Sequence, residues 1–152
     1  MSGELPKTGA TLMGEDGSTR YKFEDNYILD KRLRSGSYGV VYTTMHKATN
    51  DEYAVKVIDR TKLKKKDDDG TFREVKIMKD LLDVPNIVGL IDFYVEPQTF
   101  YMVQVYARGG DVFDRLAQRV SYTEKDSRDL GITLLKTMKE LHARKICHRD
   151  LK

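Results

Sequence analysis

LRSGSYGVVYTTMHKATNDEYAVKVI (residues 33–58) is the stretch that decides the fold. Its two β-branched and aromatic runs, VVYTTMH and EYAVKVI, are separated by turn residues, and two glycines precede the first run. YILDKRL (residues 27–33) supplies a third run immediately before them. Such runs, divided by turn residues, are typical of strands, so the sequence predicts three consecutive antiparallel strands.

The next part of the chain extends this sheet around one helix. TFREVKIMKDLLD (residues 71–83) has apolar residues at helical spacing, namely Phe72, Val75, Met78, Leu81 and Leu82. VPNIVGLIDFYV (residues 84–95) and TFYMVQVY (residues 99–106) are predicted as two more strands around an EPQ turn. The charged block KLKKKDDDG (residues 62–70) is expected to be a solvated loop.

The last part of the chain has helical patterns only. ARGGDVFDRLAQ (residues 107–118) has paired glycines followed by a short helical pattern. Thr123 and Asp126 have the spacing of a capping box, which predicts the start of a further helix. The apolar stripe of that helix consists of Leu130, Leu134, Leu135, Met138 and Leu141. The chain is therefore predicted to be α+β, with a sheet lobe followed by a helical lobe.

Composition narrows the class of protein. The 152 residues are 39% hydrophobic and 34% charged, which is typical of a globular chain with a core. A net charge of +3 gives no argument for nucleic-acid binding, and no apolar run predicts a membrane span or a secretory signal. The single cysteine excludes an internal disulfide, so we expect the cytoplasm, with the nucleus as an alternative. Residues 1–20 are expected to be a mobile tail.

Two stretches have the residue types that phosphate binding requires. Gly36 and Gly39 would let backbone N–H groups approach a phosphate, although an ordinary hairpin turn explains them as well. In YAVKV (residues 53–57), the period of two puts Ala54 and Lys56 on one face. A flat ring could lie over the alanine while the ammonium reaches its phosphates; the alternative is an exposed strand lysine.

Further along the chain are residues that could complete such a site. Glu74 lies in the predicted helix and could hold Lys56 in place, or it could simply be solvated. Asp150 could accept a proton from a hydroxyl, and Lys152 could neutralise charge on a transferring phosphoryl group. His148 and its neighbour Cys147 are expected to be packed structural residues.

Five motifs, in this order, resemble those of the N-terminal half of a eukaryotic protein kinase domain. GSYGVV (residues 36–41) resembles the glycine-rich loop, AVK (residues 54–56) the lysine strand, and FREVKIM (residues 72–78) the helix with its glutamate. YMVQVYARGGDVFDRL (residues 101–116) resembles the last small-lobe strand, the hinge and the first large-lobe helix. LKTMKELHARKICHRDLK (residues 135–152) resembles the helix and the opening of the catalytic loop.

The same motifs resemble one type of kinase more than others. HRDLK at the C-terminal end is the serine/threonine pattern, whereas tyrosine kinases usually have alanine in place of the lysine. GGDVFDRL and YTEKDSRDL resemble the calcium/calmodulin-dependent protein kinase group. Calmodulin itself would bind only through a segment outside these 152 residues.

The resemblance implies that twelve residues of the two lobes form an ATP site: Leu33, Gly36, Ser37, Gly39, Val41, Ala54, Lys56, Glu74, Gln104, Val105, Ala107 and Asp111. Among them, Lys56 would contact the α- and β-phosphates and pair with Glu74. The backbone of Val105 and Ala107 would bind the adenine edge, and Gln104 falls at the gatekeeper position. Asp111 would meet the ribose, and in a basophilic kinase a substrate arginine.

The resemblance also implies domain limits and a reaction. It predicts a five-stranded antiparallel small lobe with one main helix (residues 27–104), a hinge (residues 105–110) and the start of a large lobe (residues 111–152). The implied reaction transfers a phosphoryl group from ATP-Mg²⁺ to a protein serine or threonine hydroxyl. Asp150 would be the catalytic base and Lys152 the γ-phosphate contact.

Two departures from the family pattern affect these expectations. Arg34 stands where the family's loop begins with glycine, which bears on ATP affinity. The asparagine and the DFG aspartate that hold magnesium in the family would lie beyond Lys152, so none of these residues is expected to be a metal ligand. The 152 residues are therefore expected to be an inactive ATP-binding half of a kinase. The alternative is a non-catalytic module that binds nucleotide or another protein.

Overall fold

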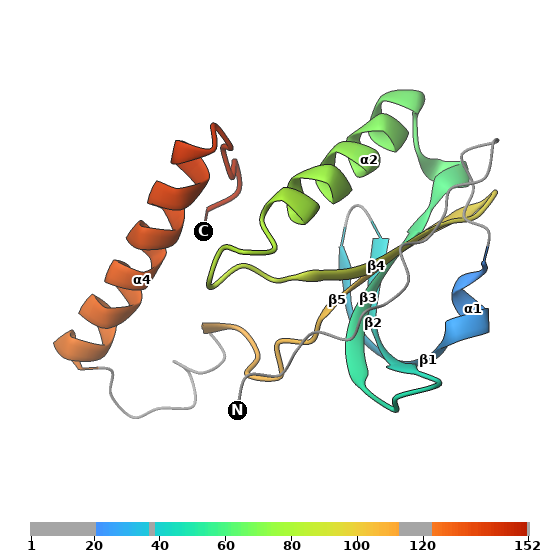
Figure 1. Cartoon of the computed structure of the whole chain (residues 1–152), viewed down its shortest axis with the longest axis horizontal. Helices are drawn as coiled ribbons and strands as arrows, with labels where there is room; N and C mark the ends of the chain where they lie inside the picture. Colours follow the sequence, from blue (N-terminus) through green and yellow to red (C-terminus); the bar gives the residue numbers. More distant parts are fainter. Residues whose placement is uncertain (1–20, 37–38, 113–122, 152) are drawn as a thin grey trace. The chain divides into compact units, whose positions relative to one another are not determined.

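The computed structural model describes residues 21–36, 39–112 and 123–151. Ser37 and Lys152, both predicted site residues, lie outside this part, as does most of the predicted helix after the paired glycines. The elements, in chain order, are α1 (Phe23–Asn26), β1 (Tyr27–Gly36), β2 (Gly39–His46), β3 (Glu52–Asp59), η1 (Arg60–Lys62), α2 (Lys65–Asp80), β4 (Leu90–Val95), β5 (Thr99–Val105) and α4 (Glu124–Ala143) (Figure 1).

The five strands form one antiparallel sheet in the order β1-β2-β3-β5-β4. The predicted α+β class and the five-stranded antiparallel sheet with one main helix are confirmed. The three N-terminal strands pair in chain order, as their short connections favour. The sheet is completed by β5, which pairs with β3 on one side and with β4 on the other.

Apolar side chains cover both faces of this sheet. On one face, α2 contributes Val75 to a core that includes Phe100 and Met102 of β5, both fully buried. On the other face, Phe23 of α1 lies in an aromatic cluster and stacks on Tyr101 with ring centroids 4.4 Å apart. The sheet is thus held between two helices of very different length (Figure 1).

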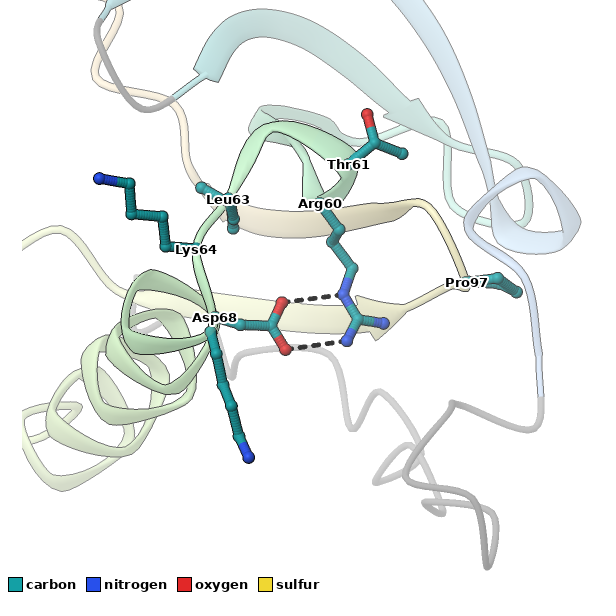
Figure 2. Close-up of a pocket in the computed structure, with 7 residues that line it drawn as sticks. Arg60, Thr61, Leu63, Lys64, Asp68 and Pro97 are labelled. Atoms are coloured by element: carbon teal, nitrogen blue, oxygen red, sulfur yellow. Dashed lines mark hydrogen bonds and ion pairs between the residues drawn. The ribbon is translucent and has the colours of Figure 1, made fainter.

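The predicted loop over residues 62–70 is wrong for most of its length, because α2 begins at Lys65. The guanidinium of Arg60 donates two hydrogen bonds to the carboxylate of Asp68, at 3.0 and 2.9 Å (Figure 2). The same guanidinium lies over the Phe100 ring, 4.4 Å from its centroid. Asp67 and Asp68 also stand in the first turn of the helix, where carboxylates complement the helix dipole.

The predicted strand over residues 84–95 is also too long. β4 spans only Leu90–Val95, and the residues before it form turns. Asn86 has a φ of 64°, which is incompatible with a strand, and the Val84 N–H donates to the Leu81 carbonyl at 3.0 Å. The apolar residues of this segment therefore lie in a turn.

The described chain divides into two compact units. The first holds the sheet, α1 and α2 and extends to Asp80, with Val88–Tyr106 added. The second holds Leu81–Ile87 together with the chain from Ala107 onward. The predicted limits of the hinge and of the two lobes stay predictions. Among the described residues, no helix combines the length and apolar character needed to cross a lipid bilayer.

Both ends of α4 carry the hydrogen bonds that satisfy a helix terminus. At its start, the Thr123 hydroxyl accepts from the Asp126 N–H while the Asp126 carboxylate accepts from the Thr123 N–H, so the predicted capping box is confirmed. At its end, the Ile146 N–H donates to the Leu141 carbonyl and Lys145 has a φ of 60°. This is a Schellman motif with lysine in the left-handed position.

Candidate functional site

An ion pair between β3 and α2 is the centre of the candidate site. The Lys56 ammonium donates to both oxygens of the Glu74 carboxylate, at 2.9 and 3.1 Å. The lysine side chain is 23% exposed and that of the glutamate 44%. A pair so open to water adds little stability, so its value lies in fixing the position of the lysine. The predicted contact between these two residues is confirmed.

The strand register puts four of the predicted ATP-site residues on one face of the sheet. Val41 lies opposite Lys56, and Ala54 lies opposite Gln104. Residues directly opposite in an antiparallel pair point to the same face, as do residues two apart in one strand. Since Glu74 of α2 reaches Lys56, this is the face that α2 covers. The face offers a small side chain beside a fixed cation.

The glycines of the first hairpin differ in how much their conformations need glycine. Gly39 has a φ of 146°, and a Cβ at this position would lie 2.5 Å from the Val57 carbonyl oxygen. At Gly36 the nearest atom to such a Cβ would be the Gly39 oxygen, at 3.8 Å. Only Gly39 is therefore required by the fold, whereas Gly36 leaves room for a ligand close to the backbone.

Gln104 has unusual neighbours at the end of β5. Its amide Nε2 lies 3.2 Å from the Met102 sulfur and 3.4 Å from the Met78 sulfur. Thioether sulfur is a weak acceptor, so the amide can exchange this contact for a better one. No sequence pattern predicted this arrangement, although the helical spacing of Met78 indicated that it faces the sheet.

One backbone group after Gln104 is already engaged in a hydrogen bond within the protein. The Val105 N–H donates to the Gly89 carbonyl at 2.9 Å, so only the Val105 carbonyl could serve a ligand. Ala107 and Asp111, the other two predicted residues of this region, belong to the second unit. Their proposed contacts with adenine and ribose stay predictions.

A cavity of about 580 Å³ lies beside the ion pair. Its lining includes Lys56 and Glu74 from the pair and Lys65, Lys66 and Arg73 from α2. The four cations of this lining face three carboxylates, those of Glu74, Asp67 and Asp69, so the cavity is polar and nearly balanced in charge.

The second unit carries Asp150, the predicted catalytic base, and its neighbours in sequence. Asp150 is exposed, and its N–H donates to Nδ1 of His148 at 3.3 Å. His148 and Cys147 are themselves exposed, so the prediction that they are packed is wrong for the described part of the chain. Their proposed packing depended on other segments covering them, and no described segment does so.

No metal site is found in the described residues. They contain no group of three or more histidine, cysteine, aspartate or glutamate side chains that could hold an ion. The resemblance places the magnesium ligands beyond Lys152, and this stays a prediction. Magnesium would supply charge neutralisation at the phosphates when bound.

Comparison with known proteins identifies the family. The family model for the protein kinase domain matches residues 27–152. Ribosomal protein S6 kinase 2 alpha of Xenopus laevis is 37% identical over 130 residues, which is 86% of this chain and 17% of that protein. Ribosomal protein S6 kinase alpha-2 of Homo sapiens is 36% identical over 86% of this chain and 17% of its own length. Calcium-dependent protein kinase 25 of Arabidopsis thaliana is 34% identical over 130 residues, which is 85% of this chain and 25% of that protein.

The chain therefore belongs to the protein kinase domain family. Its curated relatives carry the names of protein kinases, which confirms the resemblance to a serine/threonine kinase domain. The chain spans only about a sixth to a quarter of the length of these relatives.

Proposed function

We propose that the protein is an ATP-dependent serine/threonine protein kinase, and that the described sheet and α2 form its nucleotide-binding lobe. The observation that carries this proposal is the Lys56–Glu74 ion pair on the face that also holds Val41 and Ala54. A lysine held by a carboxylate keeps its position while it contacts a phosphate. The family membership supports the same reaction class.

In this proposal, adenine lies over Ala54 between Leu33 and Val41. The Val105 carbonyl and the Ala107 N–H bind its edge, and Gln104 limits how far a ring can enter. Gly36, Ser37 and Gly39 let the backbone approach the phosphates, and Lys56 neutralises their charge. Asp111 binds the ribose and, when the substrate is basic, a substrate arginine.

The transfer itself requires a proton acceptor and charge stabilisation. The substrate hydroxyl oxygen attacks the γ-phosphorus, the bond from that phosphorus to the bridging oxygen breaks, and ADP leaves. Asp150 accepts the hydroxyl proton, and Lys152 offsets charge on the phosphoryl group being transferred. The product is a phosphorylated serine or threonine.

The kinase group within this class is also part of the proposal. The sequence motifs favour the calcium/calmodulin-dependent group, and a relative named calcium-dependent protein kinase supports that choice. The relatives named ribosomal protein S6 kinase give it no support. A peptide panel that varies the arginine positions would test the basophilic preference.

The decisive experiment is a phosphate-transfer assay. The protein expressed from its complete gene is given radiolabelled ATP and a basic peptide with one serine. Lys56→Met and Asp150→Asn are each expected to lower the rate by about 10²-fold or more. Lys139→Met, which removes an exposed cation of α4, is the control and should leave the rate unchanged.

The outcomes separate the two functions considered. Loss of transfer in both site variants, with normal transfer by the control, supports the kinase. Binding of ATP without any transfer by the wild-type protein overturns it. That second outcome would instead favour a non-catalytic module that binds nucleotide or a protein partner.

A further inference from the structure

The Gln104 side chain has different neighbours on its two sides in the sheet. Gln104 of β5 lies opposite Leu90 of β4 and opposite Ala54 of β3. Directly opposite residues share a face, so all three side chains belong to the face that α2 covers. Leu90 is 7% exposed and belongs to the apolar core, whereas Ala54 is only half-buried. The space beside Gln104 is therefore filled toward Leu90 and open toward Ala54, whose side chain is a single methyl group.

Two methionines fix the orientation of the Gln104 amide. Its Nε2 lies 3.2 Å from the Met102 sulfur and 3.4 Å from the Met78 sulfur. A thioether sulfur accepts a hydrogen bond but has no hydrogen to donate, so the NH₂ group, and not the oxygen, faces the two sulfurs. The nitrogen and oxygen of an amide diverge from the same carbon. The oxygen Oε1 therefore faces away from the sulfur pair.

This oxygen is an acceptor without a donor. No described residue donates a hydrogen bond to Oε1 of Gln104. Among the described residues, only the Tyr27 hydroxyl is a buried side-chain polar atom that lacks a partner. Oε1 is thus unpaired but not sealed in the core. Since Leu90 and the two sulfurs occupy the other sides, the oxygen opens onto the space over Ala54.

The exocyclic group of a purine distinguishes adenine from guanine at this place. In the proposed function, the base lies over Ala54 and its edge meets the Val105 carbonyl. Adenine carries an amino group with two hydrogens, where guanine has a carbonyl oxygen. The Val105 carbonyl accepts one of these hydrogens. The second needs another acceptor, because a polar hydrogen that loses water without gaining a partner costs free energy.

We propose that Oε1 of Gln104 accepts the second amino hydrogen of adenine and thereby selects ATP over GTP. This inference rests on the proposed nucleotide-binding function and adds a base-specificity residue to it. With guanine, two acceptor oxygens would face each other. To donate to the guanine oxygen instead, the amide would have to give up both sulfur contacts. Met78 and Met102 are therefore positioning residues for this selection.

The test measures nucleotide affinity by calorimetry on the protein expressed from its complete gene. The nucleotides are ATP, GTP and purine riboside triphosphate, which has a hydrogen in place of the amino group of adenine. Gln104→Met keeps the length of the side chain and removes the amide. Gln98→Met makes the same change at an exposed position between β4 and β5 and is the matched control. Melting temperatures establish that each chain is folded.

Gln104→Met is expected to raise the Kd for ATP about 3- to 10-fold, to lower that for GTP, and to leave that for purine riboside triphosphate within about twofold. Gln98→Met should change none of the three. Equal losses for ATP and purine riboside triphosphate would show that Gln104 acts through its shape alone and would overturn the inference. An unchanged ratio of the Kd for GTP to that for ATP would also overturn it.

A second variant tests the orientation of the amide without changing Gln104. Met78→Leu combined with Met102→Leu roughly conserves the volume of the core and removes both sulfurs. The amide is then free to turn and donate to guanine, so the ratio of the Kd for GTP to that for ATP should fall about threefold. A ratio equal to that of the wild type would overturn the sulfur-fixed orientation on which the inference depends.

Failure of this inference can be told from failure of the proposed function. ATP binding that Gln104→Met does not weaken, in a protein where Lys56→Met does weaken it, overturns only the role of Gln104. A folded wild-type protein that binds none of the three nucleotides overturns the role of Gln104 and the nucleotide-binding function together.

Discussion

The backbone of Gly39 approaches that of Val57 so closely that no side chain fits between them. A Cβ on Gly39 would lie 2.5 Å from the Val57 carbonyl oxygen and 3.2 Å from Cγ1 of Ile58. The φ of 146° at Gly39 is also one that residues with a side chain rarely adopt. This contact ties the start of β2 to β3, directly behind the candidate phosphate-binding backbone.

We predict that Gly39→Ala lowers the free energy of unfolding by about 2–4 kcal/mol, from overpacking and backbone strain together. Gly36→Ala is the matched control, because its Cβ would have only ordinary contacts, and its cost should be less than about 1 kcal/mol. Urea denaturation of the three chains measures both effects. Similar midpoints for the two variants would contradict the importance of the Gly39 contact.

Glu74 is expected to act by positioning Lys56. Glu74→Gln keeps the size of the side chain but removes the charge that holds the ammonium. We predict that kcat of the protein expressed from its complete gene falls by about 10²-fold, with a smaller change in the KM for ATP. Glu140→Gln, at an exposed position of α4, is the control. An unchanged kcat in Glu74→Gln would mean that Lys56 needs no partner.

Local sequence signals predicted the five strands and the helix that carries Glu74, whereas the pairing of Glu74 with Lys56 followed from the resemblance to protein kinases. The period of two in YAVKV put Ala54 and Lys56 on one face, and helical spacing put Glu74 on a helix that follows them. Both patterns record burial on a face, and burial is what the tertiary structure uses. The capping box at Thr123 could also be predicted from the sequence, because all its contacts lie within four residues.

Features that depend on distant contacts could not be predicted in this way. The early start of α2 depends on Arg60, which pairs with Asp68 and lies over Phe100. The register shift of β1 between Arg32 and Arg34 exists only in relation to β2, so no local pattern predicts it. The exposure of His148 depends on which segments cover it, and a residue's own neighbours in sequence do not reveal that.

The buried hydroxyl of Tyr27 has no hydrogen-bond partner among the described residues. Burial raises the pKa of this phenol, and the nearby Asp92 carboxylate raises it further, so the group stays neutral. Tyr27→Phe removes an unpaired polar atom from the core. We predict that it raises the free energy of unfolding by about 1 kcal/mol.

Tyr94→Phe is the matched control for this prediction. The Tyr94 hydroxyl donates to Asp92 at 2.7 Å and accepts from the Asn26 amide at 3.0 Å. Its loss should lower the free energy of unfolding by about 1–2 kcal/mol. Denaturant titration separates the two variants by sign, and a destabilised Tyr27→Phe would show that its hydroxyl has a partner after all.

Lys145 occupies the left-handed position at the end of α4, where a Cβ is unfavourable. We predict that Lys145→Gly stabilises this helix end by about 1 kcal/mol, because glycine adopts that conformation without strain. Lys139→Gly, inside the same helix, should destabilise it by about the same amount. Amide hydrogen exchange along the last turns of α4 measures both changes in stability. A destabilised helix end in Lys145→Gly, as in Lys139→Gly, would contradict the Schellman assignment.

The pair between Asp83 and Arg144 should make the second unit sensitive to acid. The guanidinium donates to both carboxylate oxygens, at 2.9 and 2.6 Å, and this hydrogen bonding lowers the pKa of Asp83 below its ordinary value of 3.8. A carboxyl whose pKa is lower in the folded state stabilises the fold above its unfolded pKa. That stabilisation is lost as the pH falls through the folded pKa.

We therefore predict that Asp83→Asn has a lower melting temperature than the wild type at neutral pH, and that the difference narrows as the pH falls below 3.8 and is lost below the folded pKa. Comparing the two chains at each pH cancels the other acids, including Asp59, whose pKa is lowered by its hydrogen bond to Thr61. Arg144→Gln should remove the same pH dependence, because it removes the donor. A difference between wild type and Asp83→Asn that stays constant from neutral pH down to the lowest pH at which both chains fold would show that the carboxylate charge does not matter there.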